Sequence, residues 1–131
     1  MGEPTSPISL SELEILKALW KQGPGTVRQI NERLRRPRRR WAYTTVLTLL
    51  QRMEAKGYVV SDRSGVAHVF RSLVSREQLL RSRLKDLAKQ LCEGGTAPLV
   101  LALVEGQRYT VEEIEQFRRL LDELEPKPAK R

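Results

Sequence analysis

The stretch "RRPRRRWAYTTVLTLLQRM", residues 35–53, joins a run of arginine to an apolar segment that carries threonine. Five of its first six residues are arginine, and Pro37 interrupts the run, so the run is expected to form a loop. From Ala42 the apolar spacing predicts a helix that runs to Lys56 and ends at Gly57. Two interpretations are open: a solvated charge run beside an ordinary core helix, or a surface that binds DNA.

The two sides of this expected helix differ in chemistry. At about 100° per residue, one side is apolar and is predicted to pack in a core: Val46, Leu49, Leu50 and Met53. The other side carries hydroxyl, amide and guanidinium groups. Threonine can contact a thymine methyl or a phosphate, glutamine can bond adenine, and arginine can bond guanine. Residues near the start of such a helix reach furthest into the major groove, which favours Ala42–Thr48 as base readers. The residues of the outer side are Thr44, Thr45, Thr48, Gln51 and Arg52.

Capping-box spacing marks two helices before this segment. Ser9 is followed three residues later by Glu12, and the same spacing recurs two residues on, so a first helix is expected to start there. The "GPG" at residues 23–25 ends it. Thr26 with Gln29 repeats the spacing at the start of a short second helix.

The hydrophobic period changes to that of a strand after the third helix. The segment "YVVSDRSGVAHVFRS", residues 58–72, is rich in valine and aromatic residues and predicts a β-hairpin. Tyr58–Asp62 is expected to pair with Val66–Arg71 around a turn at residues 63–65. His68 would then lie in a strand, as a sheet or backbone-contact residue without a second metal ligand.

Three more helices are expected in the C-terminal half. One starts at Ser75 and ends at glycines 94–95, a short apolar one has Pro98 in its first turn, and the last is capped by Thr110 with Glu113. Their apolar stripes exceed what one small chain can bury, which predicts contact with a second copy of the chain. Packing onto the N-terminal domain is the alternative. The stripe residues are Leu80, Leu84, Leu87, Leu91, Ile114, Phe117, Leu121 and Leu124.

The order of these elements predicts a mainly α chain with a small β-hairpin wing. An N-terminal winged helix-turn-helix domain that binds DNA is expected over residues 9–73. A C-terminal helical dimerisation domain is expected over residues 74–125, with flexible tails at 1–8 and 126–131. In a winged helix-turn-helix, the third helix faces the major groove and the hairpin lies beside it.

Positive charge is concentrated in the N-terminal half. The chain has 131 residues and a net charge of +8. Residues 1–71 hold 13 Lys and Arg against 6 Asp and Glu, whereas residues 72–131 hold 11 against 10. A basic half beside a nearly neutral half predicts one module that binds a polyanion and one with another role.

Several classes of protein do not fit the composition. No apolar run approaches the roughly 20 residues of a membrane span, and the N-terminus lacks a signal-peptide pattern, so a cytoplasmic protein is expected. The single cysteine, Cys92, allows no internal disulfide and no multi-cysteine metal site. One histidine, no glycine-rich phosphate loop and no plausible Ser/His/Asp set leave no basis for catalysis. We therefore expect no enzyme activity, no bound metal and no cofactor.

Each candidate DNA contact also has a structural alternative. Thr44 and Thr45 could cap the third helix, and the arginine loop could be solvated. Arg63, at the tip of the hairpin, would meet the DNA backbone or the minor groove unless its turn is solvated.

The segment "WAYTTVLTLLQRMEAKGYV", residues 41–59, closely resembles the winged-helix repressors of penicillinase and methicillin-resistance genes, which are similar to the copper-responsive repressors. The opening "LSELEILKALW", the "TVRQI" of the second helix and the "VFRS" that closes the wing match as well. So does the ending, "LVLALVE" followed by "EEIEQFRRLLDEL". The likeness spans residues 9–125.

This resemblance implies a homodimeric transcriptional repressor, with each N-terminal domain on one half-site of a palindromic operator and the C-terminal helices forming the dimer. Together with the helix faces it predicts contacts with double-stranded DNA. The predicted DNA contacts are Thr26, Arg39, Arg40, Trp41, Ala42, Tyr43, Thr44, Thr45, Thr48, Gln51, Arg52 and Arg63. The predicted dimer contacts are the stripe residues given above together with Leu99 and Leu103.

The resemblance leaves the inducing signal open. In the antibiotic-resistance members, a membrane sensor-protease signals and the repressor is cut in its C-terminal region at an Asn-Phe bond. That bond aligns with Ala102–Leu103, where neither residue matches. Copper-responsive relatives carry clustered C-terminal cysteines, which Cys92 alone cannot supply. A sensor-controlled protease therefore stays an open partner.

An interaction protein of another class is the alternative function. It would use the winged-helix fold without reading DNA and would bind an acidic protein partner through the arginines.

Overall fold

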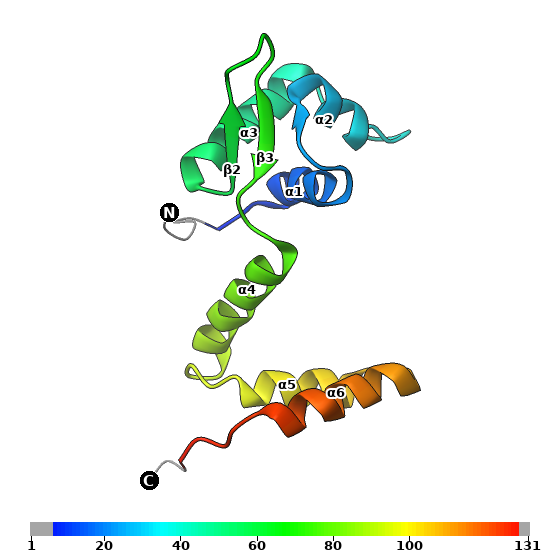
Figure 1. The fold of residues 1–131 in the computed structure, drawn as a ribbon, viewed down its shortest axis with the longest axis vertical. Coiled ribbons are helices and arrows are strands. Elements are labelled where there is room, and N and C mark those ends of the chain that lie inside the picture. Colours follow the sequence, from blue (N-terminus) through cyan, green and yellow to red (C-terminus); the bar gives the residue numbers. More distant parts are fainter. Residues whose placement is uncertain (1–6, 129–131) are drawn as a thin grey trace. The chain divides into compact units, whose positions relative to one another are not determined.

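The computed structural model describes residues 7–128, and Figure 1 shows their fold. The chain divides into two compact units at Ser82–Arg83, within the fourth helix. The predicted mainly α fold, with three helices, a small sheet and three further helices, is confirmed. The elements are α1 (Leu10–Gln22), β1 (Gly25–Thr26), α2 (Val27–Leu34), α3 (Tyr43–Lys56), β2 (Val59–Asp62), β3 (Val69–Ser72), α4 (Arg76–Leu91), α5 (Ala97–Gly106) and α6 (Val111–Glu123).

The expected flexible tails, residues 1–8 and 126–131, lie mostly outside the described part of the chain. Residues 1–6 and 129–131 lie outside the described residues. Within the described part, Ile8 is buried in the core.

Helices α1 and α2 start where reciprocal capping satisfies free backbone N–H groups. At the start of α1, the Glu12 N–H donates to Ser9 Oγ (3.1 Å) and the Ser9 N–H donates to Glu12 Oε1 (2.8 Å). The same pair of bonds joins Thr26 and Gln29 before α2. These contacts confirm both predicted starts, because a capping box specifies a helix end from local sequence alone.

The core of the first unit lies between α1, α2, α3 and the sheet. Ile15, Leu16 and Ile30 are fully buried and pack against the apolar side of α3. On α3, the predicted core residues Val46, Leu49, Leu50 and Met53 are all buried. The prediction that this side of α3 faces the core is therefore confirmed.

The sheet has three antiparallel strands in the order β1-β3-β2. Strand β1 was not predicted: Gly25 pairs with Phe70 and Thr26 with Val69, across a large separation in sequence. Phe70 is buried, so this pairing closes the sheet over the core.

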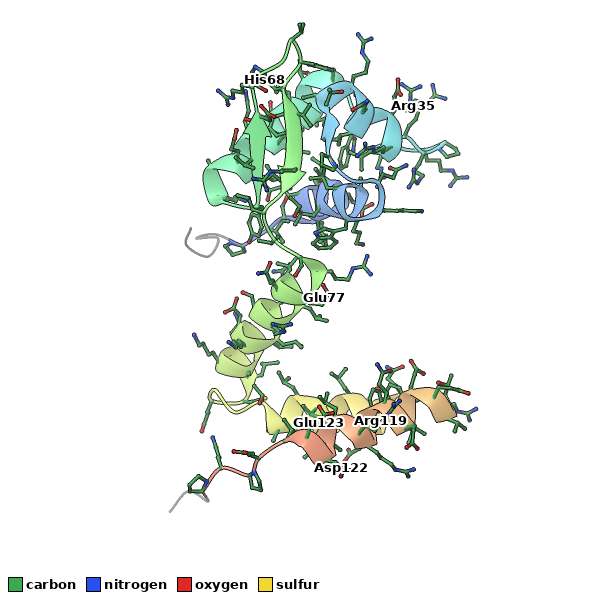
Figure 2. All side chains as sticks on the ribbon, in the orientation of Figure 1. Arg35, His68, Glu77, Arg119, Asp122 and Glu123 are labelled. Atoms are coloured by element: carbon green, nitrogen blue, oxygen red, sulfur yellow. The ribbon has the colours of Figure 1, made fainter. Side chains whose placement is uncertain are left out.

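The wing differs from the predicted hairpin. Asp62 pairs with Val69, so residues 63–68 form the loop and the predicted strand start at Val66 and three-residue turn are wrong. The Asp62 carboxylate accepts bonds from the Ser64 N–H (2.9 Å) and hydroxyl (2.7 Å), an Asx turn that ends the first strand. His68 consequently lies in the loop and not in a strand (Figure 2).

A buried ion pair joins α1 to the last residue of α3. The Glu12 side chain is 1% exposed, and its Oε1 lies 2.7 Å from Lys56 Nζ. Lys56 also donates to the Pro7 carbonyl (3.2 Å). Burial alone would raise the pKa of Glu12, but the bonds from Lys56 and Ser9 outweigh it and hold the pKa below its ordinary value. The carboxylate is therefore charged at neutral pH and fixes the end of α3 against α1.

The helices of the second unit bury little apolar surface within one chain. The Tyr109 hydroxyl donates to the Leu103 carbonyl (2.6 Å), and its ring packs edge to face on Phe117 with centroids 5.0 Å apart. These contacts connect α5 to the start of α6, whose capping box of Thr110 and Glu113 is as predicted. Of the described residues of this unit, only Ala88 is buried.

The Glu12–Lys56 pair yields a stability prediction. Lys56→Met should lower the free energy of unfolding by about 2 kcal/mol, because a buried carboxylate then loses its charged donor. The control Lys21→Met removes an exposed ammonium from α1 that has no ion-pair partner in the described chain, and should change stability little. Urea unfolding measures both, and equal losses would contradict the buried pair.

The same pair predicts a dependence on pH. A carboxylate whose folded pKa is depressed stabilises the fold above its ordinary pKa of 4.5, and that contribution is lost as the pH falls through the folded value. Acid should therefore weaken the wild type more than Lys56→Met, in which the depression is removed. Urea unfolding repeated from neutral to acid pH tests this, and equal acid losses in both proteins would contradict it.

Candidate nucleic-acid interface

The outer side of α3 is an exposed surface without acidic residues in its first two turns. Tyr43 is 52% exposed, and Ala42, at the N-cap position, is exposed as well. Thr44, Thr45, Thr48, Gln51 and Arg52 are all exposed. The structure thus brings the predicted base-reading residues of α3 together on one side. A shallow depression there is lined by Thr44, Thr45, Thr48, Leu49 and Arg52.

The two threonines at the start of α3 do not cap it. Ala42 occupies the N-cap position and provides no side-chain bond, while the Thr45 and Val46 N–H groups both donate to its carbonyl. The alternative of a capping role for Thr44 and Thr45 is therefore wrong. Among the described residues, neither hydroxyl has a hydrogen-bond partner, so both are available to a ligand.

The arginine run, residues 35–40, forms a tight turn before α3. Backbone bonds join Arg36 and Arg39 in both directions at 3.0 Å, with Pro37 between them. Arg39 is half-buried: its Nη1 lies 2.7 Å from Glu14 Oε1, and its Nη2 donates to the Leu34 carbonyl (2.9 Å). The predicted loop is confirmed, but its Arg39 has partners within the chain.

Trp41 and Glu14 complete this contact. The Arg39 guanidinium lies over the Trp41 ring, 5.1 Å from its centroid, at a distance typical of a cation–π contact. The bond from Arg39, aided by Lys17, holds the pKa of Glu14 below its ordinary value. Trp41 is half-buried against the core beside this pair, next to the N-cap residue of α3.

The wing carries Arg63, which is held toward α3. Glu54 Oε2 accepts from the Ser61 N–H (2.9 Å) and hydroxyl (2.8 Å), while Arg63 Nη2 lies 3.3 Å from Glu54 Oε1. Burial would raise the pKa of Glu54, but these bonds and the arginine charge hold it below its ordinary value. Arg63 is thus an exposed cation near the C-terminal turns of α3.

Thr26, the remaining predicted contact, is half-buried and its hydroxyl caps α2. A hydroxyl that accepts the Gln29 N–H keeps its own hydrogen for a second partner. Its place at the α2 N-terminus is compatible with an anion nearby.

The described part of the chain, residues 7–128, holds no group of three His, Cys, Asp or Glu side chains that could bind a metal ion. It also contains no helix with the length and hydrophobicity of a membrane span.

Three packed helices followed by a two-stranded wing, with the outer side of the third helix exposed, define a winged helix-turn-helix protein. A family model described as "Penicillinase repressor" matches residues 8–123. The chain therefore belongs to the penicillinase repressor family, whose members are transcriptional repressors and not enzymes.

Two relatives and one solved structure illustrate the similarity. The chain is 37% identical to "Transcriptional regulator BlaI" of Mycobacterium tuberculosis over 120 residues, covering 88% of this chain and 85% of that protein. It is 27% identical to "Methicillin resistance regulatory protein MecI" of Mammaliicoccus sciuri, covering 93% and 98%. A MarR family protein from Bacillus stearothermophilus aligns with a TM-score of 0.49 and 25% identity, over 89% of this chain and 72% of that chain.

Glu54 was not predicted to take part in this surface. It is a carboxylate on α3 that faces the wing, and the contact becomes visible only when the strand after α3 folds back. The sequence carries one local signal for it, the Ser61-Asp62-Arg63 segment that offers two donors at the end of β2.

Glu54→Ala should loosen the wing without unfolding the domain. The Ser61 N–H and hydroxyl and the Arg63 guanidinium would lose their shared acceptor, so the Ser61 amide should exchange with solvent faster. Native-state hydrogen exchange measures this directly, with amides of α1 as the internal reference. An unchanged Ser61 rate would show that Glu54 does not hold the wing.

Proposed function

We propose that the chain is a homodimeric transcriptional repressor that binds a palindromic operator. In this proposal α3 lies in the major groove and the wing follows the DNA backbone. The observation that carries it is the outer side of α3, where free hydroxyls, an amide and a guanidinium are exposed together. Relatives named as a transcriptional regulator and a methicillin resistance regulatory protein support the same role.

Base reading is assigned to the first turns of α3. Tyr43, Thr44, Thr45 and Thr48 lie nearest its N-terminus, the end that reaches furthest into the groove in helix-turn-helix proteins. Gln51 and Arg52 would contact bases or phosphates farther along. Thr26, Arg40 and Arg63 carry groups suited to phosphate oxygens, which fix position without reading sequence.

Dimer formation is assigned to the second unit. Leu91, Leu121 and Leu124 are 72%, 61% and 62% exposed in a single chain. Soluble monomers rarely expose continuous apolar patches of this kind, and a second copy of the same chain would cover them. The nearly neutral charge of residues 72–131 suits contact between two identical surfaces.

Relief of repression is proposed to act through this same unit. The bond aligned with the family's cleavage site, Ala102–Leu103, lies within α5. The Leu103 carbonyl also accepts the Tyr109 hydroxyl bond. A protease that cuts extended chain would need α5 to unwind first. A cut at this bond would break α5 and disrupt the proposed dimer contacts.

Substitution of the α3 threonines tests base reading. Thr44→Ala and Thr48→Ala should each lower discrimination among DNA sequences, by about 1–3 kcal/mol at a base whose contact is lost. Selection from a random duplex library, followed by sequencing, measures the change. Thr96→Ala, an exposed threonine in the second unit whose side chain makes no cap bond, is the matched control. Unchanged base preference in both α3 variants would contradict the assignment.

Substitution in α6 tests the dimer. Leu121→Glu places a charge in the exposed apolar stripe, so the protein should sediment as a monomer at concentrations where the wild type is a dimer. Gln116→Glu adds the same charge to α6, about 140° around the helix from Leu121, and should stay dimeric. A dimer of Leu121→Glu as stable as the wild type would place the interface elsewhere.

A further inference from the structure

We propose that the arginine turn, residues 35–40, is a preorganised phosphate-binding element in which Arg39 is the anchor and contacts no DNA. The guanidinium groups that bind the DNA backbone are those of Arg35, Arg38 and Arg40. This inference rests on the proposed function and specifies which groups of that surface meet phosphate. Arg39 is then a positioning residue, in contrast to the DNA contact that the sequence suggested for it.

The Arg39 guanidinium already has partners within the chain. Its Nη1 donates to the Glu14 carboxylate, and its Nε (3.3 Å) and Nη2 (2.9 Å) both donate to the Leu34 carbonyl. Its face covers the Trp41 ring. Three of its five N–H groups are thus taken, so only the other two could donate to a phosphate while these contacts hold.

The contacts of Arg39 fix the whole turn. Leu34 is the last residue of α2, Glu14 belongs to α1, and Trp41 lies next to the α3 N-cap. Through these contacts Arg39 holds the turn, together with the start of α3, against two other helices. The paired backbone bonds with Arg36 and the fixed φ of Pro37 restrict the turn further.

Three guanidinium groups of the turn have no partner within the described residues. Arg35, Arg38 and Arg40 are exposed, and Arg35 points outward from the end of α2 in Figure 2. The only carboxylate that the described structure pairs with the turn is Glu14, which Arg39 occupies. Three like charges on one short turn repel one another until anions lie between them.

Phosphate is the anion that this arrangement favours. Guanidinium forms paired hydrogen bonds with phosphate oxygens, and a chain held in place in advance loses less rotamer freedom on binding. The turn directly precedes the helix proposed to enter the major groove. Its free arginines would therefore contact the phosphates that flank the bases read by α3.

Glu14→Ala tests whether Arg39 is an anchor, because the two possibilities predict opposite changes in affinity for DNA. The variant removes a negative charge and on charge alone would strengthen binding to DNA. If Arg39 is an anchor, the variant should instead bind a short mixed-sequence duplex about three- to tenfold more weakly, because the arginines are no longer held in place. Arg39→Ala should weaken binding equally, and the double variant should be no weaker than either.

Glu32→Ala is the matched control for the effect of removing one negative charge on DNA affinity. It removes the same charge from an exposed residue of α2 whose carboxylate has no partner in the described chain, so binding should be unchanged or stronger. Circular dichroism and thermal unfolding of each variant confirm that the fold is retained. Tighter binding by Glu14→Ala than by the wild type would overturn the proposal, because it would show that Glu14 holds back a DNA-contacting Arg39.

The free arginines are tested by salt dependence in the full chain. Replacing Arg35, Arg38 and Arg40 by alanine should reduce the slope of log affinity against log salt by about 0.9 for each lost phosphate contact. The control replaces Arg108, Arg118 and Arg119, which removes equal charge from the second unit, and should leave the slope unchanged. Equal slopes for the wild type and the turn variant would overturn the proposal.

Three further outcomes have defined meanings. A loss of affinity confined to A·T-rich duplexes would place the arginines in the minor groove and overturn phosphate binding. Retained sequence preference with an unaltered salt slope would reject this inference and leave the proposed function intact. A wild type that binds no duplex would reject the proposed function itself.

Discussion

Val46, Leu50 and Met53 pack between α1, α2 and the sheet, and this packing sets the orientation of α3. These side chains are fully buried, so α3 cannot rotate about its axis without exposing them and burying threonine hydroxyls in their place. The core thereby decides which residues face outward. The chemistry of the outer surface follows from this rotation, since every third or fourth residue of α3 belongs to the other side.

Charged contacts then fix α3 at both ends. Just before α3 begins, Arg39 bonds Glu14 of α1 and covers Trp41. At the last residue of α3, Lys56 bonds the buried Glu12, which also belongs to α1. Between them, Glu54 holds the first strand of the wing. All three carboxylates hold α3 or the wing in position, and the exposed outer side of the first turns of α3 carries no acidic residue.

Most helix starts and the orientation of α3 are predictable from local signals in the sequence. The starts of α1, α2, α4 and α6 depend on capping residues three positions apart, and the two sides of α3 depend on helical periodicity. Strand β1, the length of the wing loop and the partner of Arg39 were missed because each depends on residues far apart in the chain. Gly25 meets Phe70, and Glu14 meets Arg39, only after the helices have packed. An arginine run therefore predicts charge, but its anchored and free members are distinguished only by the fold.

We propose that the outer side of α3 reads DNA sequence. This can be tested by sequencing the genomic fragments that the purified protein retains at near-physiological salt. Specific complexes exceed non-specific ones in affinity by a factor of about 10³ or more, so true operators should rise above background. A short motif with dyad symmetry near a few promoters should then be recovered. Uniform retention of all fragments, lost steeply as salt is raised, would contradict it and leave only a basic protein on a polyanion.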